Sequence, residues 1–292
     1  MLKKISHYLS LIKFSHTIFA MPFAIIGFFL GYRDSQHLNA TKNYTLIFSL
    51  ILLCMVFARS AAMAFNRYID EKYDKMNPRT ALREIPAGLI SKPQALLFII
   101  ANSILFIVCT SFINVLCFML SPIALFVILF YSYTKRFTAL CHIVLGVGLA
   151  LAPIGAYLAV TGHFATAPLL FSLVVLTWVS GFDILYALQD EDFDKEFALR
   201  SIPVYLGRKK SMQLSIFIHV VTAILVLGIG YVYLNQFFYW LGALLFIALL
   251  IYQHTLVKPH DISKINLAFG TTNGIAGVVF SVFVIASIIH FL

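Results

Sequence analysis

The sequence predicts an all-α integral membrane protein, and its composition is the first reason. Of the 292 residues, 61% are hydrophobic and only 11% are charged, whereas soluble domains carry roughly 25% charged residues. Several apolar stretches also reach the ~20 residues that a helix needs to cross a bilayer. Lipid tolerates only helices or closed barrels. These stretches are continuous and do not alternate like barrel strands, so we expect helices.

The hydropathy pattern divides the chain into about nine candidate spans within one polytopic membrane domain, residues 1–292. We expect these spans to surround a central cavity. Their predicted ranges are 14–33, 44–66, 94–113, 115–133, 140–160, 167–189, 212–234, 237–254 and 267–291.

Lysine and arginine are distributed unequally between the two sides that nine spans define. One side receives 18 of the 21 lysines and arginines, the other receives Arg33 and Lys42, and Arg59 lies within a span. Because cytoplasmic loops of membrane proteins are enriched in basic residues, the N-terminus is predicted to be cytoplasmic and the C-terminus outside. The net charge of +9 therefore indicates orientation in membrane lipid, and no nucleic acid partner is expected.

Two of the predicted cytoplasmic loops, about 67–93 and 190–211, are long and charged, whereas the loops on the other side are short. Function is therefore expected at the cytoplasmic ends of the second and sixth spans. Asp190 lies 120 residues after Asp70, and four spans restore the same chain direction. A parallel repeat of four-helix units is therefore plausible.

Acidic residues recur at helical spacing at these two span ends. Asn66, Asp70 and Asp74 follow one another at four-residue steps, which places them on one helical face. The second set shares a helical face in the same way and consists of Asp183, Tyr186, Asp190 and Asp194. Carboxylates brought this close repel one another unless a cation lies between them. Such oxygen ligands suit Mg²⁺, which takes one or two carboxylates and completes its coordination with phosphate oxygens.

The sequence therefore predicts that Asp70, Asp74, Asp190 and Asp194 bind Mg²⁺, that Mg²⁺ binds a diphosphate, and that the apolar helices hold a hydrocarbon tail. A cation-coupled transporter is the alternative from another class, since it also uses intramembrane carboxylates. Transport sites lie near the middle of the membrane, however, whereas these motifs lie at one face.

These motifs resemble those of the UbiA superfamily of intramembrane prenyltransferases. The similarity runs from about residue 10 to 210 and rests on NRYIDEKYD (66–74), NPRTALREIPAG (77–88), YSYTKRF (131–137), DILYALQDEDFD (183–194) and Arg200-Ser201 followed by Gly207. The resemblance implies nine helices around a cavity that opens to lipid, two Mg²⁺ ions and a polyprenyl diphosphate donor. It also implies alkylation of an aromatic acid, in the cytoplasmic (inner) membrane of a bacterium.

Within the superfamily, the second motif is most similar to that of the 4-hydroxybenzoate polyprenyltransferases, which act in ubiquinone biosynthesis. Haem-type farnesyltransferases have a different second motif. The first span carries KFSHT (13–17) where many hydroxybenzoate enzymes have an R-x-D-K-P-like stretch. This departure leaves a dihydroxynaphthoate, used in futalosine-type menaquinone biosynthesis, as the alternative acceptor.

Individual residues are assigned roles on this basis. Arg59 is expected to bind the acceptor carboxylate, because arginine matches its two oxygens; the alternative is a structural pair with Asp183. Asp183 and Tyr186 are expected to act on the acceptor, or else to make packing hydrogen bonds. Arg83 lies in the predicted loop 67–93. Some basic side chains of this loop should face diphosphate and others solvent. The residues predicted to bind substrate are Asn66, Arg67, Lys72, Arg79, Lys135, Arg136 and Arg200.

Overall fold

A computed structural model of the chain describes residues 2–12, 19–36 and 42–290. The described part is almost entirely helical, and it contains no β-strand beyond one isolated bridge between Lys258 and Asp261. The helices are α1 (Leu2–Leu11), α2 (Met21–Ser35), α3 (Tyr44–Met76), α4 (Lys92–Ser111), α5 (Val115–Thr134), α6 (Cys141–Thr161), α7 (Thr166–Tyr186), η2 (Ala187–Asp190), α8 (Glu191–Glu196), α9 (Ile202–Val232), α10 (Phe237–Leu256), η3 (Leu267–Thr272) and α11 (Asn273–Ile289).

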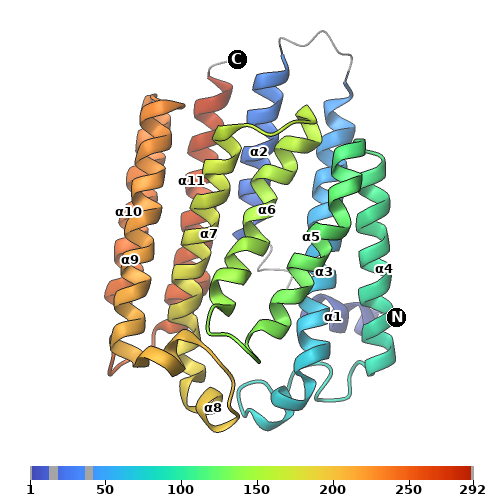
Figure 1. Cartoon of the computed structure of the whole chain (residues 1–292), viewed down its shortest axis with the longest axis vertical. Helices are drawn as coiled ribbons and strands as arrows, with labels where there is room; N and C mark the ends of the chain where they lie inside the picture. Colours follow the sequence, from blue (N-terminus) through green and yellow to red (C-terminus); the bar gives the residue numbers. More distant parts are fainter. Residues whose placement is uncertain (1, 13–18, 37–41, 291–292) are drawn as a thin grey trace.

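The long helices run side by side between two ends of one bundle (Figure 1). Eight helical stretches in the described residues are long and apolar enough to cross a membrane. The predicted first span, 14–33, corresponds to α2, but residues 13–18 lie outside the described part. The all-helical membrane fold predicted from the sequence is therefore confirmed.

One end of the bundle carries α1, the segment that joins α3 to α4, and α8; the C-terminal end of α11 lies at the opposite end (Figure 1). We call the end that carries α8 the aspartate end, because both acidic motifs lie there. Helix formation continues into the charged stretches expected to be loops. Helix α3 extends to Met76, and η2 and α8 cover residues 187–196, so both motifs are held on helical backbone.

Glycine allows α2 and α6 to lie in close contact, as the Gly27-x-x-x-Gly31 spacing predicts. A Cβ atom at Gly27 would lie 2.0 Å from the carbonyl oxygen of Pro153, and one at Gly31 would lie 2.9 Å from Cβ of Val160. The same spacing at Gly270-x-x-x-Gly274 also predicts close helix contact, but this is wrong for Gly270, since a Cβ atom there would meet no atom within 4 Å. Gly270 lies in the π-helical turn η3, which is not a close helix contact.

Candidate active site

The first acidic motif is fixed on the last turns of α3. Asn66 Nδ2 donates a 3.1 Å hydrogen bond to Asp70 Oδ2, one helical turn away. Asp70 Oδ1 also pairs with Arg136 at 2.8 Å. Asp74, a further turn on, pairs with Arg83 at 2.8 Å. The four-residue spacing thus directs all three motif side chains into one polar layer.

The second motif is divided between three consecutive helical elements. Helix α7 ends at Tyr186 and is followed by the 3₁₀ turn η2, which contains Asp190, and then by α8, which contains Asp194. Arg79 contacts both carboxylate oxygens of Asp190, with Nη2 at 2.8 Å from Oδ1 and 2.7 Å from Oδ2. Asp194 is completely buried and its Oδ1 lies 2.7 Å from Lys135 Nζ.

Each of the four aspartates therefore has its own basic partner, and all four partners lie outside the helix that carries the aspartate. Asp190 attracts the Lys135 ammonium, and Asp194 both attracts it and hydrogen-bonds to it. These interactions outweigh burial and hold the pKa of Lys135 above its usual range. The pairs tie the segments before α4 and α6 to the two motifs, so the site forms only when the bundle has assembled.

Both acidic motifs contain a buried carboxylate oxygen that accepts no hydrogen bond from any described residue. These oxygens are Asp74 Oδ2 and Asp194 Oδ2, whereas the equally buried Asp194 Oδ1 has the Lys135 ammonium 2.7 Å away. A buried carboxylate oxygen without a partner is costly. The described residues contain no group of three or more side chains already close enough to hold a metal ion together. Each motif nevertheless has one such oxygen, of the kind that a hard divalent cation prefers.

Tyr186 connects the second motif to the C-terminal part of the chain. Its hydroxyl lies 3.4 Å from Arg79 Nη1, and the Arg79 guanidinium lies 5.8 Å from the ring centroid. The ring stacks on Phe269 with centroids 4.0 Å apart. Phe269 belongs to η3, and such π-helical turns often occur at functional sites. The last third of the chain, which carries no recognisable motif, therefore contributes to the site.

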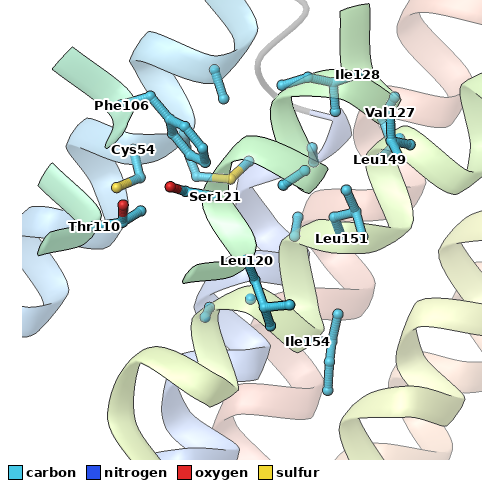
Figure 2. A pocket seen from close by; sticks show the side chains of 18 of the residues that line it. Cys54, Phe106, Thr110, Leu120, Ser121, Val127, Ile128, Leu149, Leu151 and Ile154 are labelled. Carbon is cyan, nitrogen blue, oxygen red and sulfur yellow. The ribbon is translucent and has the colours of Figure 1, made fainter. Parts of the chain in front are cut away.

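An apolar cavity of about 410 Å³ lies between α3, α4, α5 and α6 (Figure 2). Its walls are aliphatic and aromatic side chains such as Phe106, Leu120 and Ile154. Among the described residues that line it, Arg59 is the only charged one. Arg59 Nε is buried and makes no hydrogen bond with any described residue, so the guanidinium is available to an anion in the cavity.

Tyr131 on α5 links this cavity to the acidic motifs. Its side chain lines the cavity and interacts electrostatically with Asp70, Asp183 and Arg59. Tyr131 thus lies within electrostatic range of both motifs and of the cavity arginine. A tail in the cavity would lie next to a charged group at the aspartate end.

Asp183 does not pair with Arg59, which was the alternative considered for Arg59, and contacts a histidine instead. Its Oδ2 lies 2.7 Å from Nδ1 of His142, whose side chain is 4% exposed, against 20% for Asp183. His142 is the second residue of α6. No motif or helical spacing in the sequence predicts a role for this histidine.

Three residues predicted to bind substrate lie elsewhere. The Arg67 side chain is 3% exposed and faces Glu84, at 3.6 Å. Glu84 in turn accepts a hydrogen bond from Ser10 of the N-terminal segment. Lys72 is exposed and makes no ion pair with any described residue. Arg200 is also exposed, and its guanidinium donates to the carbonyl oxygen of Phe137 at 2.8 Å.

Sequence reasoning missed His142 and Tyr131 as site residues, although one signal could have identified them. Both are polar side chains at the ends of otherwise apolar helices, at the same end of the bundle as the motifs. Buried polar residues within spans mark functional sites more often than chance. Their partners lie far away in sequence, however, and no helical spacing reveals them.

Fold and site together define an intramembrane enzyme with paired carboxylates at one end of an apolar cavity. The family model described as "UbiA prenyltransferase family" matches residues 20–284, so the chain belongs to the UbiA prenyltransferase family. It is an integral membrane protein, and the family resemblance of its motifs is confirmed.

Individual relatives agree with this. A 4-hydroxybenzoate octaprenyltransferase of Tolumonas auensis is 30% identical over 237 residues, covering 80% of this chain and 82% of that protein. One from Aliivibrio fischeri is 29% identical over 79% of this chain and 80% of its own length.

Two solved structures share the fold. A UbiA homologue from Aeropyrum pernix has a TM-score of 0.79 at 27% identity, covering 94% of this chain and 98% of that one. A homologue from Archaeoglobus fulgidus bound to GPP and Mg²⁺ has a TM-score of 0.71 at 23% identity, covering 97% and 99%.

Proposed function

We propose that this protein transfers a polyprenyl group from polyprenyl diphosphate to the ring of 4-hydroxybenzoate, with Mg²⁺ as cofactor. The observation that carries the proposal is the position of the four aspartates. They lie at one end of the bundle, each paired with a basic side chain, and the apolar cavity next to them has one charged lining residue. The names of the relatives supply the aromatic acceptor and the octaprenyl class of donor.

Asp70, Asp74, Asp190 and Asp194 would hold the metal. The buried oxygens of Asp74 and Asp194 that lack a hydrogen bond fit this role. When bound, Mg²⁺ neutralises the charge that develops on the departing diphosphate. Four basic side chains already lie beside these carboxylates and would turn to the phosphate oxygens: Arg79, Arg83, Lys135 and Arg136. Asn66 orients Asp70 through its hydrogen bond.

The cavity would hold the prenyl chain, and its walls would keep water from the allylic cation that forms when diphosphate leaves. Arg59 would bind the carboxylate of the acceptor, because its guanidinium has donors to spare and matches a carboxylate fork. The ring carbon would then be held close to the cationic carbon, which is the main requirement of a transfer between two bound groups.

Asp183 would take the proton that the ring loses after alkylation. It is a carboxylate oriented by His142 and interacts electrostatically with Tyr131 at the cavity wall. Tyr186 would hold Arg79 through its hydroxyl and its ring. The site would open to the cytoplasmic side of a bacterial inner membrane, since the aspartate end carries most of the basic residues.

The test is product analysis of the purified protein in detergent with Mg²⁺ and a polyprenyl diphosphate. 4-Hydroxybenzoate and a dihydroxynaphthoate are offered in separate reactions. We expect prenylated hydroxybenzoate as the product, and expect Asp70→Asn and Asp190→Asn to abolish it while the protein remains folded. Product from the naphthoate alone would overturn the acceptor and retain the chemistry.

Asp192→Asn is the matched control. Asp192 lies on α8 between the two aspartates of the second motif, but its side chain is 87% exposed and contacts only Arg208, at 3.4 Å. It should keep normal turnover. If the motif variants kept full prenyl transfer, the metal assignment would be wrong.

A further inference from the structure

We infer that His142 is a positioning residue that fixes the carboxylate of Asp183 for the transfer reaction. The inference rests on the proposed function, since it gives Asp183 the role of proton acceptor. His142 lies at the start of α6 and Asp183 near the end of α7. Their side chains meet at 2.7 Å between His142 Nδ1 and Asp183 Oδ2.

Both nitrogens of the imidazole face a partner. Nδ1 donates to the carboxylate oxygen Oδ2 of Asp183 at 2.7 Å. Nε2 faces the backbone N–H of Ile202 at 3.4 Å. The ring is therefore held on both sides, with Nδ1 directed at Asp183.

Close packing of α6 against α7 holds the imidazole in place. One helical turn after His142, a Cβ atom at Gly146 would lie 2.5 Å from Ser180 Oγ and 2.6 Å from the carbonyl oxygen of Leu176. Ser180 Oγ also donates to the carbonyl oxygen of His142, at 3.3 Å. The His142 side chain is 4% exposed, so it has little room to take another rotamer.

The orientation leaves one oxygen of Asp183 available. Oδ2 is held by His142, whereas Oδ1 accepts no hydrogen bond from the described residues, and the Asp183 side chain is 20% exposed. His142 itself is buried behind the carboxylate and would not touch the acceptor. It therefore acts through Asp183, as second-layer partners do when they orient a functional group.

The experiment compares His142→Leu with His142→Gln in the full-length protein in detergent. The glutamine amide can donate to Asp183 and accept from the Ile202 N–H, whereas leucine can do neither. With 4-hydroxybenzoate, His142→Leu should lower kcat about 10- to 100-fold and leave the KM for the prenyl diphosphate within about threefold. His142→Gln should recover most of kcat.

A double-mutant cycle with Asp183→Asn separates positioning from a general structural role. If His142 acts only through Asp183, His142→Leu should cause no further loss of kcat in the Asp183→Asn background. His219→Leu is the matched control for removing a buried imidazole, since His219 is 4% exposed and contacts His254 and Trp178. It should leave the ratio of kcat to the hydroxybenzoate KM near normal.

Several results would overturn the inference. One is that His142→Leu keeps kcat within threefold of the wild type. Another is that His142→Leu and His142→Gln lower kcat equally. A third is that the fold-losses of kcat in His142→Leu and Asp183→Asn multiply in the double variant. If His142→Leu does not fold, His142→Ala replaces it both in the comparison with His142→Gln and in the cycle with Asp183→Asn. Absence of prenylated hydroxybenzoate from the wild type would instead reject the proposed function.

Discussion

Arg79 and Asp190 are 111 residues apart, yet the Arg79 guanidinium contacts both oxygens of the Asp190 carboxylate. Arg79 lies in the segment that follows α3, and Asp190 ends η2 after α7. A bidentate ion pair of this kind is strong and geometrically specific. It closes the aspartate end by joining the two halves of the bundle.

Arg79 should therefore contribute to donor binding in a way that lysine cannot reproduce. We expect Arg79→Ala to lower kcat/KM for the prenyl diphosphate about 100-fold, and Arg79→Lys about 10-fold, because lysine offers a single ammonium. Steady-state kinetics with varied donor and saturating acceptor measure this.

Arg208→Lys provides the control for Arg79, since Arg208 pairs with Glu191 and Asp192, outside the cluster. Its kinetics should be near wild type. An Arg79→Lys variant with unchanged kcat/KM would show that the bidentate contact between Arg79 and Asp190 plays no part in donor binding.

Arg59 should determine the preference for acceptors that carry a carboxylate. Replacing it with methionine is expected to raise the KM for 4-hydroxybenzoate about 10- to 100-fold, the loss of one charge-assisted hydrogen-bond pair. The donor KM should stay near normal. Phenol, which lacks the carboxylate, serves as the comparison, and its already poor turnover should not fall further. An equal loss of turnover with both acceptors would show that Arg59 does not bind the acceptor carboxylate.

The volume of the cavity should limit the length of the prenyl chain. Gly155 lines the cavity, and a Cβ atom there would meet no atom within 4 Å. Gly155→Leu should therefore place a side chain in the cavity and reduce turnover of long-chain donors about 10-fold or more, while a ten-carbon donor is used normally. The order-of-magnitude loss reflects the overpacking that a long tail would cause.

Gly228→Leu is the matched control, since Gly228 on α9 is equally open and does not line the cavity. Turnover of both donors should be unaffected. Equal use of long and short donors by Gly155→Leu would mean that the prenyl chain does not bind in this cavity.

Gly27 should be needed for the contact between α2 and α6. A Cβ atom 2.0 Å from a backbone oxygen forces the helices apart, so Gly27→Ala should lower thermal stability in detergent by roughly 1–3 kcal/mol. Gly155→Ala, in open space on α6, should instead be neutral or stabilising, because alanine favours helix. Thermal unfolding with a thiol-reactive dye compares them, and equal melting temperatures would contradict the packing argument.

Much of this site could be predicted from local spacing, and the rest depends on contacts between distant residues. The steps from Asn66 to Asp74 place three side chains on one face because a single helix carries them. The partner of Asp183 could not be found in this way, since His142 lies 41 residues earlier on another helix. Arg67 was predicted to bind substrate from its position beside Asn66. The adjacent helix face is buried, however, and Arg67 faces Glu84 there.

The pairing of four aspartates with four basic side chains means that the chain supplies its own counter-ions. A metal ion that binds these carboxylates must displace guanidinium or ammonium groups, which remain attached to the chain, so metal binding adds positive charge to the site. The displaced groups, Arg79, Arg83, Lys135 and Arg136, then need an anion. Diphosphate supplies it, so metal and donor should each raise the affinity for the other by the same factor.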